Sequence, residues 1–381
     1  MYTPNFKSYM IRPLFSLLKT SSLKNLLLKG FTKLSTLFPK YPENNERFLI
    51  VSTTGLGDTL WATPAIRALR YSHPKAYIGT LTTPLGTEVF KNNPHINEIF
   101  VLKKPILFSV IRLFSILRKK QIGTILVFHT SQRIVLPLCS FIGSSQIIGS
   151  ENINKGLDFI LTKTLKRKNT HEIQRRLDLV SLVGAKPIDF HMEVFLDRYD
   201  KEAAHKLLSN IPSHIPIIGI HPGAKDKFRQ WPKEHFIELA KRLQDHLGCL
   251  VVFTGGAQEK KLIQKITQAV PSAISFPGGL PAHTLAALIQ RCSLFIVGDT
   301  GPMHLAFAVK TPTVALFCPS DPKLFGPYFL DKCAVIKKHH TCTPCLKKKC
   351  REPFCMRQIS IEEVFDQSIN LIQRSHFNKS H

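Results

Sequence analysis

Hydrophobic and polar positions along the chain follow two periodicities, one typical of buried strands and one typical of amphipathic helices. Between residues 46 and 196, short β-branched or aromatic runs alternate with stretches of helical period. We expect the strands at 48–52, 76–81, 96–102, 122–128, 146–149 and 190–196, and helices that include 66–71, 107–117 and 172–183. Such alternation predicts parallel βαβ units.

The same pattern restarts in the second half of the chain. The expected elements are a strand at 215–221, a helix at 233–247, a strand at 249–254, helices at 258–270 and 285–291, a strand at 294–298, a helix at 302–309 and a strand at 312–317. We therefore predict an N-terminal arm at 1–45, a first α/β domain at 46–205 and a second at 206–381. In two-domain α/β proteins, ligands bind at the carboxyl ends of the strands, in the cleft between the domains.

Composition and charge narrow the class of partner. The chain has 381 residues with 44% hydrophobic and 20% charged side chains, which excludes a disordered or fibrous protein. Its 52 Lys and Arg exceed its 26 Asp and Glu, so the formal net charge is +26 and an anionic partner is expected. The cations concentrate in residues 1–42, 103–120 and 332–351.

Residues 1–42 contain seven Lys or Arg and no acid, interleaved with leucine and phenylalanine. This basic amphipathic pattern fits an arm that attaches to an anionic membrane surface. It equally fits a solvated helix packed on the body, or a leader resembling a transit peptide. The chain has no run of 18 apolar residues, and the apolar patch at 13–18 is too short for a signal peptide, so we expect neither a membrane span nor a secretory signal.

A strand, a glycine turn and a helix follow one another at residues 48–70. Gly55 and Gly57 let the backbone approach a ligand, but Leu60 stands where a dinucleotide fingerprint needs a third glycine, so a nicotinamide cofactor is not supported. Asp58 lies at the mouth of the expected cleft. It is either a helix cap or a general base that faces the opposite domain.

Two further motifs predict contacts to a nucleotide. The loop after the strand at 215–221 carries three cations, Lys225, Lys227 and Arg229, unless it is only a solvated basic loop. Of these, we expect Lys227 and Arg229 to hold a phosphate group. Glu259 follows the glycines of the next strand. It is either placed for the helix dipole or accepts hydrogen bonds from ribose hydroxyls.

The most specific motif is LFIVGDTGPMHLAFAV at 294–309. Asp299 or Thr300 caps a helix that begins at a proline, so the amides around Thr300 and Gly301 form an anion site suited to a pyrophosphate. His304 lies in the first turn of that helix and can donate to a phosphate or sugar oxygen. Capping alone explains Asp299 and Thr300, but it does not explain the histidine in the same turn.

With these motifs, the stretch from residue 47 to 321 resembles glycosyltransferase family 9, the ADP-heptose:lipopolysaccharide heptosyltransferases. The resemblance is carried by STTGLGD with TPAIRAL, HPGA with KFRQWP, FTGG with Glu259, and GDTGPMHLAFAVKTPTVALFCPSDP. It implies an α/β, GT-B fold of two Rossmann-like domains facing a central cleft. It also implies inverting sugar transfer from a nucleotide donor without a catalytic metal.

The resemblance also implies roles for individual residues. Asp58 matches the catalytic base of the family, and Asp299, Thr300, Gly301 and His304 match its donor-binding turn. Glu259 falls where the family binds the nucleoside ribose. Arg229 falls where heptosyltransferases usually have a Lys on the donor phosphates, and an arginine keeps the charge but changes the geometry.

Four cysteines close to the C-terminus form a separate pattern, Cys342, Cys345, Cys350 and Cys355. They can close a structural zinc site, although the second pair lacks the short spacing of a zinc ribbon, or they are free thiols in a reducing compartment. We expect no cofactor to be required for catalysis.

Taken with its resemblance to glycosyltransferase family 9, the sequence predicts an inverting glycosyltransferase that moves a heptose from ADP-heptose to the inner core of lipopolysaccharide, with lipid A–Kdo as acceptor. The expected partners are the nucleotide-sugar donor, the anionic lipid-linked glycan acceptor and the inner membrane surface, and the expected location is the inner face of the cytoplasmic membrane. Alternatives are the same fold with another nucleotide sugar, or a non-catalytic nucleotide-sugar-binding protein. Nucleic acid is not expected, because the basic segments lack a nucleic-acid-binding signature.

Overall fold

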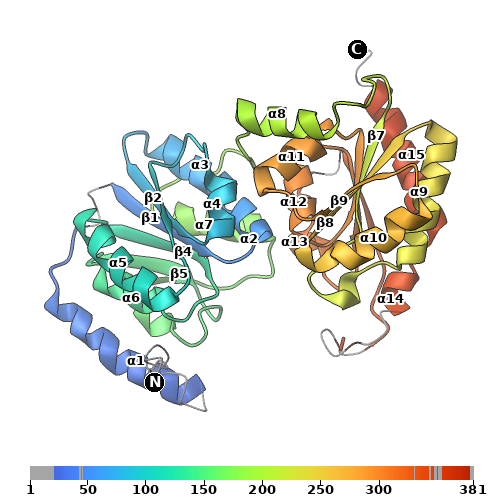
Figure 1. Ribbon diagram of the computed structural model, residues 1–381. Helices are drawn as coiled ribbons and strands as arrows, with labels where there is room; N and C mark the ends of the chain where they lie inside the picture. Colours follow the sequence, from blue (N-terminus) through green and yellow to red (C-terminus); the bar gives the residue numbers. More distant parts are fainter. Residues whose placement is uncertain are drawn as a thin grey trace, which may run out of the picture.

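The fold consists of two α/β domains, each built on a parallel sheet of six strands (Figure 1). The structure is a computed structural model. It describes residues 21–377 apart from residues 43, 45, 330, 343–344, 347–349 and 351–353. The two sheets lie side by side with helices packed on them, which confirms the predicted α/β, GT-B-like class.

The first domain has the strand order β3-β2-β1-β4-β5-β6. Its elements are β1 (Arg47–Thr53), α2 (Leu56–Leu60), α3 (Thr63–Ser72), β2 (Tyr77–Thr82), α4 (Pro84–Phe90), β3 (Glu98–Val101), α5 (Ile106–Lys119), β4 (Thr124–Thr130), α6 (Val135–Phe141), β5 (Gln146–Ser150), η4 (Asp158–Ile160), β6 (Lys163–Leu165) and α7 (Glu172–Ser181). Strand order reverses beside β1, so the β1–α2 turn lies where such sheets bind ligands.

The second domain has the strand order β12-β11-β10-β7-β8-β9. Its elements are β7 (Ile217–His221), η5 (Lys227–Arg229), α9 (Lys233–Leu247), β8 (Leu250–Gly256), η6 (Ala257–Glu259), α10 (Lys260–Ala269), β9 (Ile274–Gly278), α11 (Ala282–Arg291), β10 (Leu294–Gly298), α12 (Gly301–Ala308), β11 (Thr313–Phe317), α13 (Pro322–Phe325), β12 (Cys333–Lys337), α14 (Phe354–Arg357) and α15 (Ile361–Phe377). Here β7 and β10 are the central strands.

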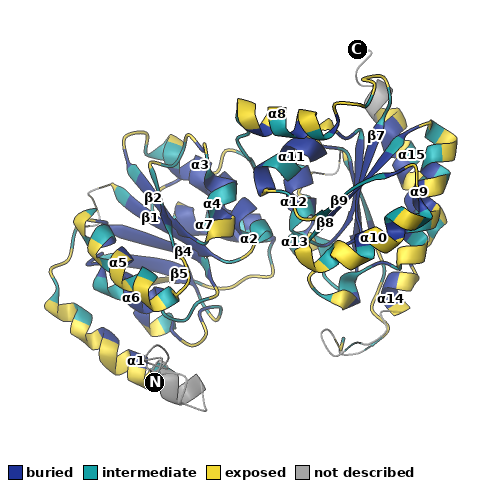
Figure 2. Cartoon of the chain, in the orientation of Figure 1, coloured by how far each residue is buried: buried dark blue, intermediate teal, exposed yellow. Residues whose placement is uncertain are grey.

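The central strands are continuous hydrophobic runs because helices cover both faces of each sheet. In β1, Leu49, Ile50 and Val51 are all fully buried, and Figure 2 shows the strands of both domains as the buried interior. One hydrophobic cluster extends across the domain interface and joins Trp61 of the first domain to Met303 of the second. The two domains are therefore in direct hydrophobic contact beside the cleft.

The prediction of a strand at 190–196 is wrong. This segment is irregular, and it runs between the domains with Phe190 stacked on Tyr328 at 4.0 Å and His191 stacked on Phe329 at 3.9 Å between ring centroids. Its apolar side chains are explained by packing on the interface rather than by membership of a sheet.

Helix α8 (Arg198–Leu207) connects the domains. Although most of it lies before residue 206, its Ala204 packs in one cluster with Ile217, Ala287 and Leu288 of the second domain. Figure 1 shows α8 alongside α11.

The described part of the N-terminal arm is a helix, α1 (Ser21–Lys33), followed by η2 (Leu34–Leu37). Leu28 and Thr32 are buried against the first domain, and the Asn25 amide donates to the Lys155 carbonyl at 3.1 Å. The described part of this helix is thus packed on the body, while its attachment to a membrane stays a prediction. Residues 1–20, 43 and 45 of the predicted arm lie outside the described residues. Within the described part of the chain, none of the helices is both long and apolar enough to span a membrane.

Candidate active site

The cleft between the domains has a volume of about 1020 Å³ and is lined by the carboxyl ends of strands from both sheets. The first domain contributes residues 53–58, Trp61, Thr83, Leu85, Ser131 and Gln132. The second contributes His221, 224–226, Arg229, 254–259, Phe276, Gly279, Leu280, Leu285, 299–302 and His304. The structure thus brings together Asp58, Arg229, Glu259, Asp299, Thr300, Gly301 and His304, as the sequence predicted.

Lys227 lies apart from this group. It is exposed in η5, and among the described residues that line the cleft it is Lys225 that supplies the lysine of this loop. A contact between Lys227 and a donor stays a prediction.

The turn between β1 and α2 brings the first domain close to the second. Gly55 precedes α2 in extended conformation, and Asp58 lies in the first turn of that helix. A Cβ atom placed on Gly57 would lie only 2.5 Å from Cδ2 of His304. Glycine at this position therefore allows α2 to touch α12 across the interface.

Asp58 is held by two basic side chains of its own domain. Its Oδ1 lies 3.5 Å from Nδ1 of His129, at the end of β4, and 3.4 Å from Nη2 of Arg176, on α7. Burial raises the pKa of Asp58, but the neighbouring His129 and Arg176 lower that pKa by more, so that it falls well below its ordinary value. Asp58 is therefore an ionised carboxylate at the cleft, able to accept a proton.

Sequence reasoning missed His129, Arg176 and Glu172 as site residues. Arg176 is fully buried, and its Nη1 donates to Oε2 of Glu172 at 2.7 Å. The neighbouring arginines lower the pKa of Glu172 to about 2 although burial opposes this. Two signals were present in the sequence, a histidine just after an expected strand and a Glu-x-x-Arg-Arg spacing on an expected helix.

On the opposite wall, Arg229 and Asp299 form an ion pair. Nη1 of Arg229 donates to Oδ2 of Asp299 at 2.7 Å, and the hydroxyl of Ser320 donates to the same oxygen. Asp299 is buried, whereas Arg229 is partly exposed in the cleft. Asp299 is thus placed to orient the guanidinium of Arg229, whose remaining N–H groups stay available to an anion.

The N-terminus of α12 lies beside this pair. Thr300 is the N-cap residue, its side chain makes no capping hydrogen bond, and Pro302 stands in the first turn. His304 is buried with its ring at 4.8 Å from that of Trp61, and burial lowers its pKa to about 4. A neutral imidazole and free helix amides form a cradle for a negatively charged group.

Glu259 and His221 complete the wall of the cleft that the second domain forms. A Cβ on Gly223 would lie 2.4 Å from Cγ of Glu259, so glycine at that position makes room for the Glu259 side chain. His221 at the end of β7 lies 3.0 Å from the hydroxyl of Thr254, and burial lowers its pKa to about 4. Sequence reasoning placed His221 at the end of a strand without giving it a role.

Cys342, Cys345 and Cys355 form no disulfide bonds among the described residues. Within the described residues, no group of three His, Cys, Asp or Glu side chains is arranged to hold a metal ion. A structural zinc at Cys342, Cys345, Cys350 and Cys355 stays a prediction.

Comparison with known proteins shows which family this chain resembles. Residues 111–355 match the family model described as glycosyltransferase family 9 (heptosyltransferase). Lipooligosaccharide heptosyltransferase 2 of Campylobacter jejuni serotype O:2 is 25% identical over 335 residues, which cover 85% of this chain and 97% of that protein.

Two solved structures share the fold. The glycosyl transferase family 9 protein of Veillonella parvula aligns with a TM-score of 0.75 and 22% identity, covering 86% of this chain and 97% of that one. The E. coli ADP-heptose LPS heptosyltransferase II aligns with a TM-score of 0.71 and 20% identity, covering 87% and 99%. Since the family model spans more than half of the sequence, the chain belongs to glycosyltransferase family 9, the heptosyltransferases, and it is a glycosyltransferase.

Proposed function

We propose that this enzyme transfers a heptose from ADP-heptose to the inner core of lipopolysaccharide, with lipid A–Kdo as the acceptor. The observation that carries the proposal is the ionised Asp58 on one wall of the cleft, opposite an arginine and a helix N-terminus on the other. The similarity to a lipooligosaccharide heptosyltransferase over 85% of the chain supports heptose as the sugar.

In the proposed reaction, the acceptor hydroxyl attacks the anomeric carbon from the face opposite the diphosphate. Asp58 takes the hydroxyl proton, the new C–O bond forms, and the bond to the diphosphate breaks, so the configuration inverts. The proton becomes acidic as the attacking oxygen bonds to the electron-poor carbon, so a carboxylate of low pKa suffices as the base.

The departing nucleoside diphosphate carries the developing negative charge. In this proposal, Arg229, Lys225, the amides at Thr300 and Gly301, and His304 stabilise that charge from the wall of the cleft that the second domain forms. Lys227 would add a more distant positive charge. Glu259 would accept hydrogen bonds from the ribose hydroxyls, and no metal ion or other cofactor enters this proposal.

The direct test offers the purified enzyme several nucleotide sugars with a lipid A–Kdo acceptor and weighs the product by mass spectrometry. We expect a gain of one heptose residue with ADP-heptose, and a much smaller yield with UDP- or GDP-linked hexoses. A preference for another nucleotide sugar would correct the donor. Binding of ADP-heptose without any product would instead indicate a non-catalytic binding protein.

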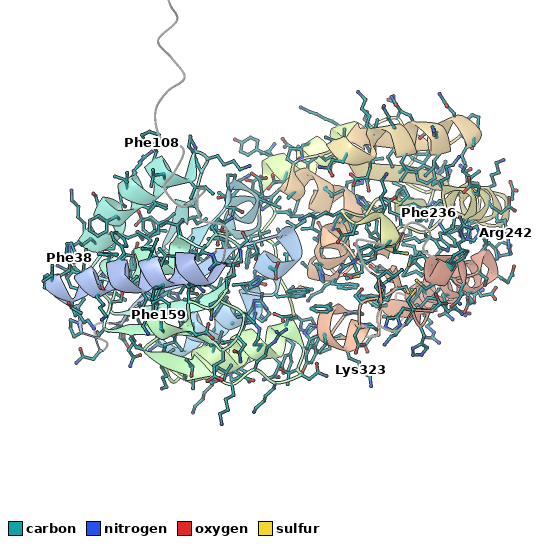
Figure 3. All side chains as sticks on the ribbon, turned by 90° about the horizontal axis from the view of Figure 1, so that it is seen from below. Phe38, Phe108, Phe159, Phe236, Arg242 and Lys323 are labelled. Carbon is teal, nitrogen blue, oxygen red and sulfur yellow. The ribbon has the colours of Figure 1, made fainter. Side chains whose placement is uncertain are left out.

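We further propose that the first domain docks on the inner face of the cytoplasmic membrane, where the lipid-anchored acceptor lies. Its underside, defined here as the outer faces of α1, η2 and α5, exposes large apolar side chains such as Leu37 (78%) and Phe108 (73%). Phe38 at the end of η2 lies 6.0 Å from Phe114 of α5 between ring centroids, so these elements adjoin. Figure 3 shows α1 crossing the lower face of the first domain, with Phe38 near one end of the helix and Phe108 at the edge of this face.

The charge of this underside fits an anionic lipid surface. Exposed lysines and arginines lie on α1, on α5 and just before α5, among them Lys29, Lys33, Lys103, Lys104 and Arg112. Each cation near such a surface contributes about 1 kcal/mol, and shallow insertion of the apolar groups adds to this.

Vesicle sedimentation tests this docking. We expect Leu37→Asp with Phe108→Asp to lose binding to anionic vesicles but to keep activity on a delipidated acceptor. Tyr199→Asp is the matched control, since Tyr199 is equally exposed (79%) but lies on α8. Unchanged sedimentation of the double variant would contradict the assignment of this surface.

A further inference from the structure

Arg176 is a charged side chain that is fully buried beside the proposed base. Its guanidinium contacts Asp58 through Nη2 and Glu172 through Nη1, and it lies over the ring of Trp61 with 5.4 Å between its central carbon and the ring centroid. Replacing a buried ion pair with hydrophobic residues of similar volume is often neutral or stabilising, so the stability of the fold alone does not explain an arginine at this position. The contact with Asp58 places the positive charge of Arg176 next to the proposed base.

Glu172 fixes where Arg176 points. Arg176 Nη1 donates both to the side chain of Glu172 and to its carbonyl oxygen, at 2.7 and 2.8 Å. Arg175 shares Glu172 but turns away from the cleft and donates to the carbonyl of Phe128 and the hydroxyl of Ser150. Arg175 and Arg176 thus both contact Glu172, but only Arg176 contacts Asp58.

Both basic neighbours of Asp58 contact the same oxygen, Oδ1. The other oxygen, Oδ2, lies on the side of Gly55, a residue that lines the cleft. We propose that Arg176, anchored by Glu172, is a positioning residue for catalysis, which holds Oδ1 of Asp58 so that Oδ2 faces the acceptor hydroxyl and takes its proton. This inference rests on the proposed function, because it assigns an atom to the base.

The same contacts connect the base to the donor half of the site. Trp61, beneath the Arg176 guanidinium, packs on His304 at 4.8 Å and on Phe325 at 5.8 Å between ring centroids, both from the second domain. Arg176 thus supports the tryptophan that contacts the donor-binding helix. Loss of Arg176 should disturb the orientation of Asp58 more than the affinity for the nucleotide, which lies on the other wall.

A pH profile separates positioning from mere structural support. The charged and titratable groups that face Asp58 are His129 from β4, Arg176 from α7 and His304 from α12. Arg176 lowers the pKa of Asp58, so its removal should raise that pKa and move the acid limb of kcat upward. An arginine within ion-pair distance lowers the pKa of an aspartate by about 1 to 3 units, which is the shift that we expect in Arg176→Met.

Three variants make the test specific. Arg175→Met removes the same charge from the same helix without touching Asp58, and its acid limb should stay near that of the wild type. Glu172→Gln with Arg176→Met removes both partners of the buried pair and is expected to fold if Arg176→Met does not. Arg176→Lys keeps a positive charge and should bring the acid limb part of the way back.

The experiment measures kcat and nucleoside-diphosphate affinity against pH, together with the titration of the Asp58 carboxyl carbon by NMR after selective 13C labelling, assigned with Asp58→Asn. We expect a raised acid limb, a matching NMR shift and affinity within about threefold of the wild type. An Asp58 titration that is the same in Arg176→Met, or in the double variant, as in the wild type would overturn the inference. The NMR titration needs no turnover, so a protein that transfers no heptose would refute the proposed function while the Arg176–Asp58 coupling is still measured.

Discussion

The contact between Gly57 and His304 makes a Gly57→Ala substitution a sharp probe of the domain interface. The new Cβ would lie 2.5 Å from Cδ2 and 3.0 Å from Nε2 of His304, whereas ordinary contacts begin at 3.4 Å. The ring or helix α2 must therefore move by about 1 Å, and His304 is buried against Trp61 and cannot yield freely.

Two opposing effects set the expected stability. Overpacking costs about 1 to 3 kcal/mol, while alanine in place of glycine inside a helix contributes about 1 kcal/mol, so the net loss is about 0 to 2 kcal/mol. The effect on turnover should be larger, because misplacing reacting groups by about 1 Å costs about 100-fold. We thus expect a folded enzyme with strongly reduced kcat.

The assay measures kcat and thermal unfolding of Gly57→Ala beside Gly30→Ala. Gly30 is the matched control, because it is a helical glycine on α1 and a Cβ there would meet nothing within 4 Å. The control should keep full turnover. Gly57→Ala with wild-type turnover would refute the reasoning that close α2–α12 contact sets the site geometry.

Two further predictions concern Arg229 and His221, on the wall of the cleft that the second domain forms. Arg229→Ala should weaken nucleoside-diphosphate binding by about 1.5 to 3 kcal/mol, measured by calorimetry, and unchanged affinity would remove Arg229 from the donor site. Burial lowers the pKa of His221 to about 4, so unfolding takes up a proton at that histidine between pH 4 and about 6.5, and stability falls as pH falls through this window. His221→Gln should lower the slope of stability against pH by about one proton, and an unchanged slope would contradict this.

Strands whose two faces are both buried could be predicted from the sequence. β1, β7 and β10 carry hydrophobic runs of the expected length, and the glycine turns after them locate the cleft. Strands β6, β9 and β12 escaped prediction because they are only partly buried, so their composition carries little periodic signal, and β6 has only three residues. The strand predicted at 190–196 was wrong because the apolar side chains of this segment pack on the domain interface, although the segment belongs to neither sheet.

Some of the site residues could be located from the sequence, and others could not. Asp58, Asp299 and His304 lie in turns directly after strands, and such turns can be located from one sequence. Arg176 reaches Asp58 from α7, more than a hundred residues away, and nothing local indicates that its side chain points inward. The choice between Lys225 and Lys227 depended on the path of the loop backbone, which spacing alone does not fix.

The measurement that tests the proposed mechanism most directly is the turnover of Asp58→Asn at saturating ADP-heptose and acceptor. The asparagine keeps the shape of the side chain but cannot take the proton, so we expect kcat to fall by about 10² to 10⁴ while calorimetry shows unchanged nucleoside-diphosphate affinity. Heptose transfer by Asp58→Asn at close to the wild-type rate would contradict the assignment of Asp58 as the base.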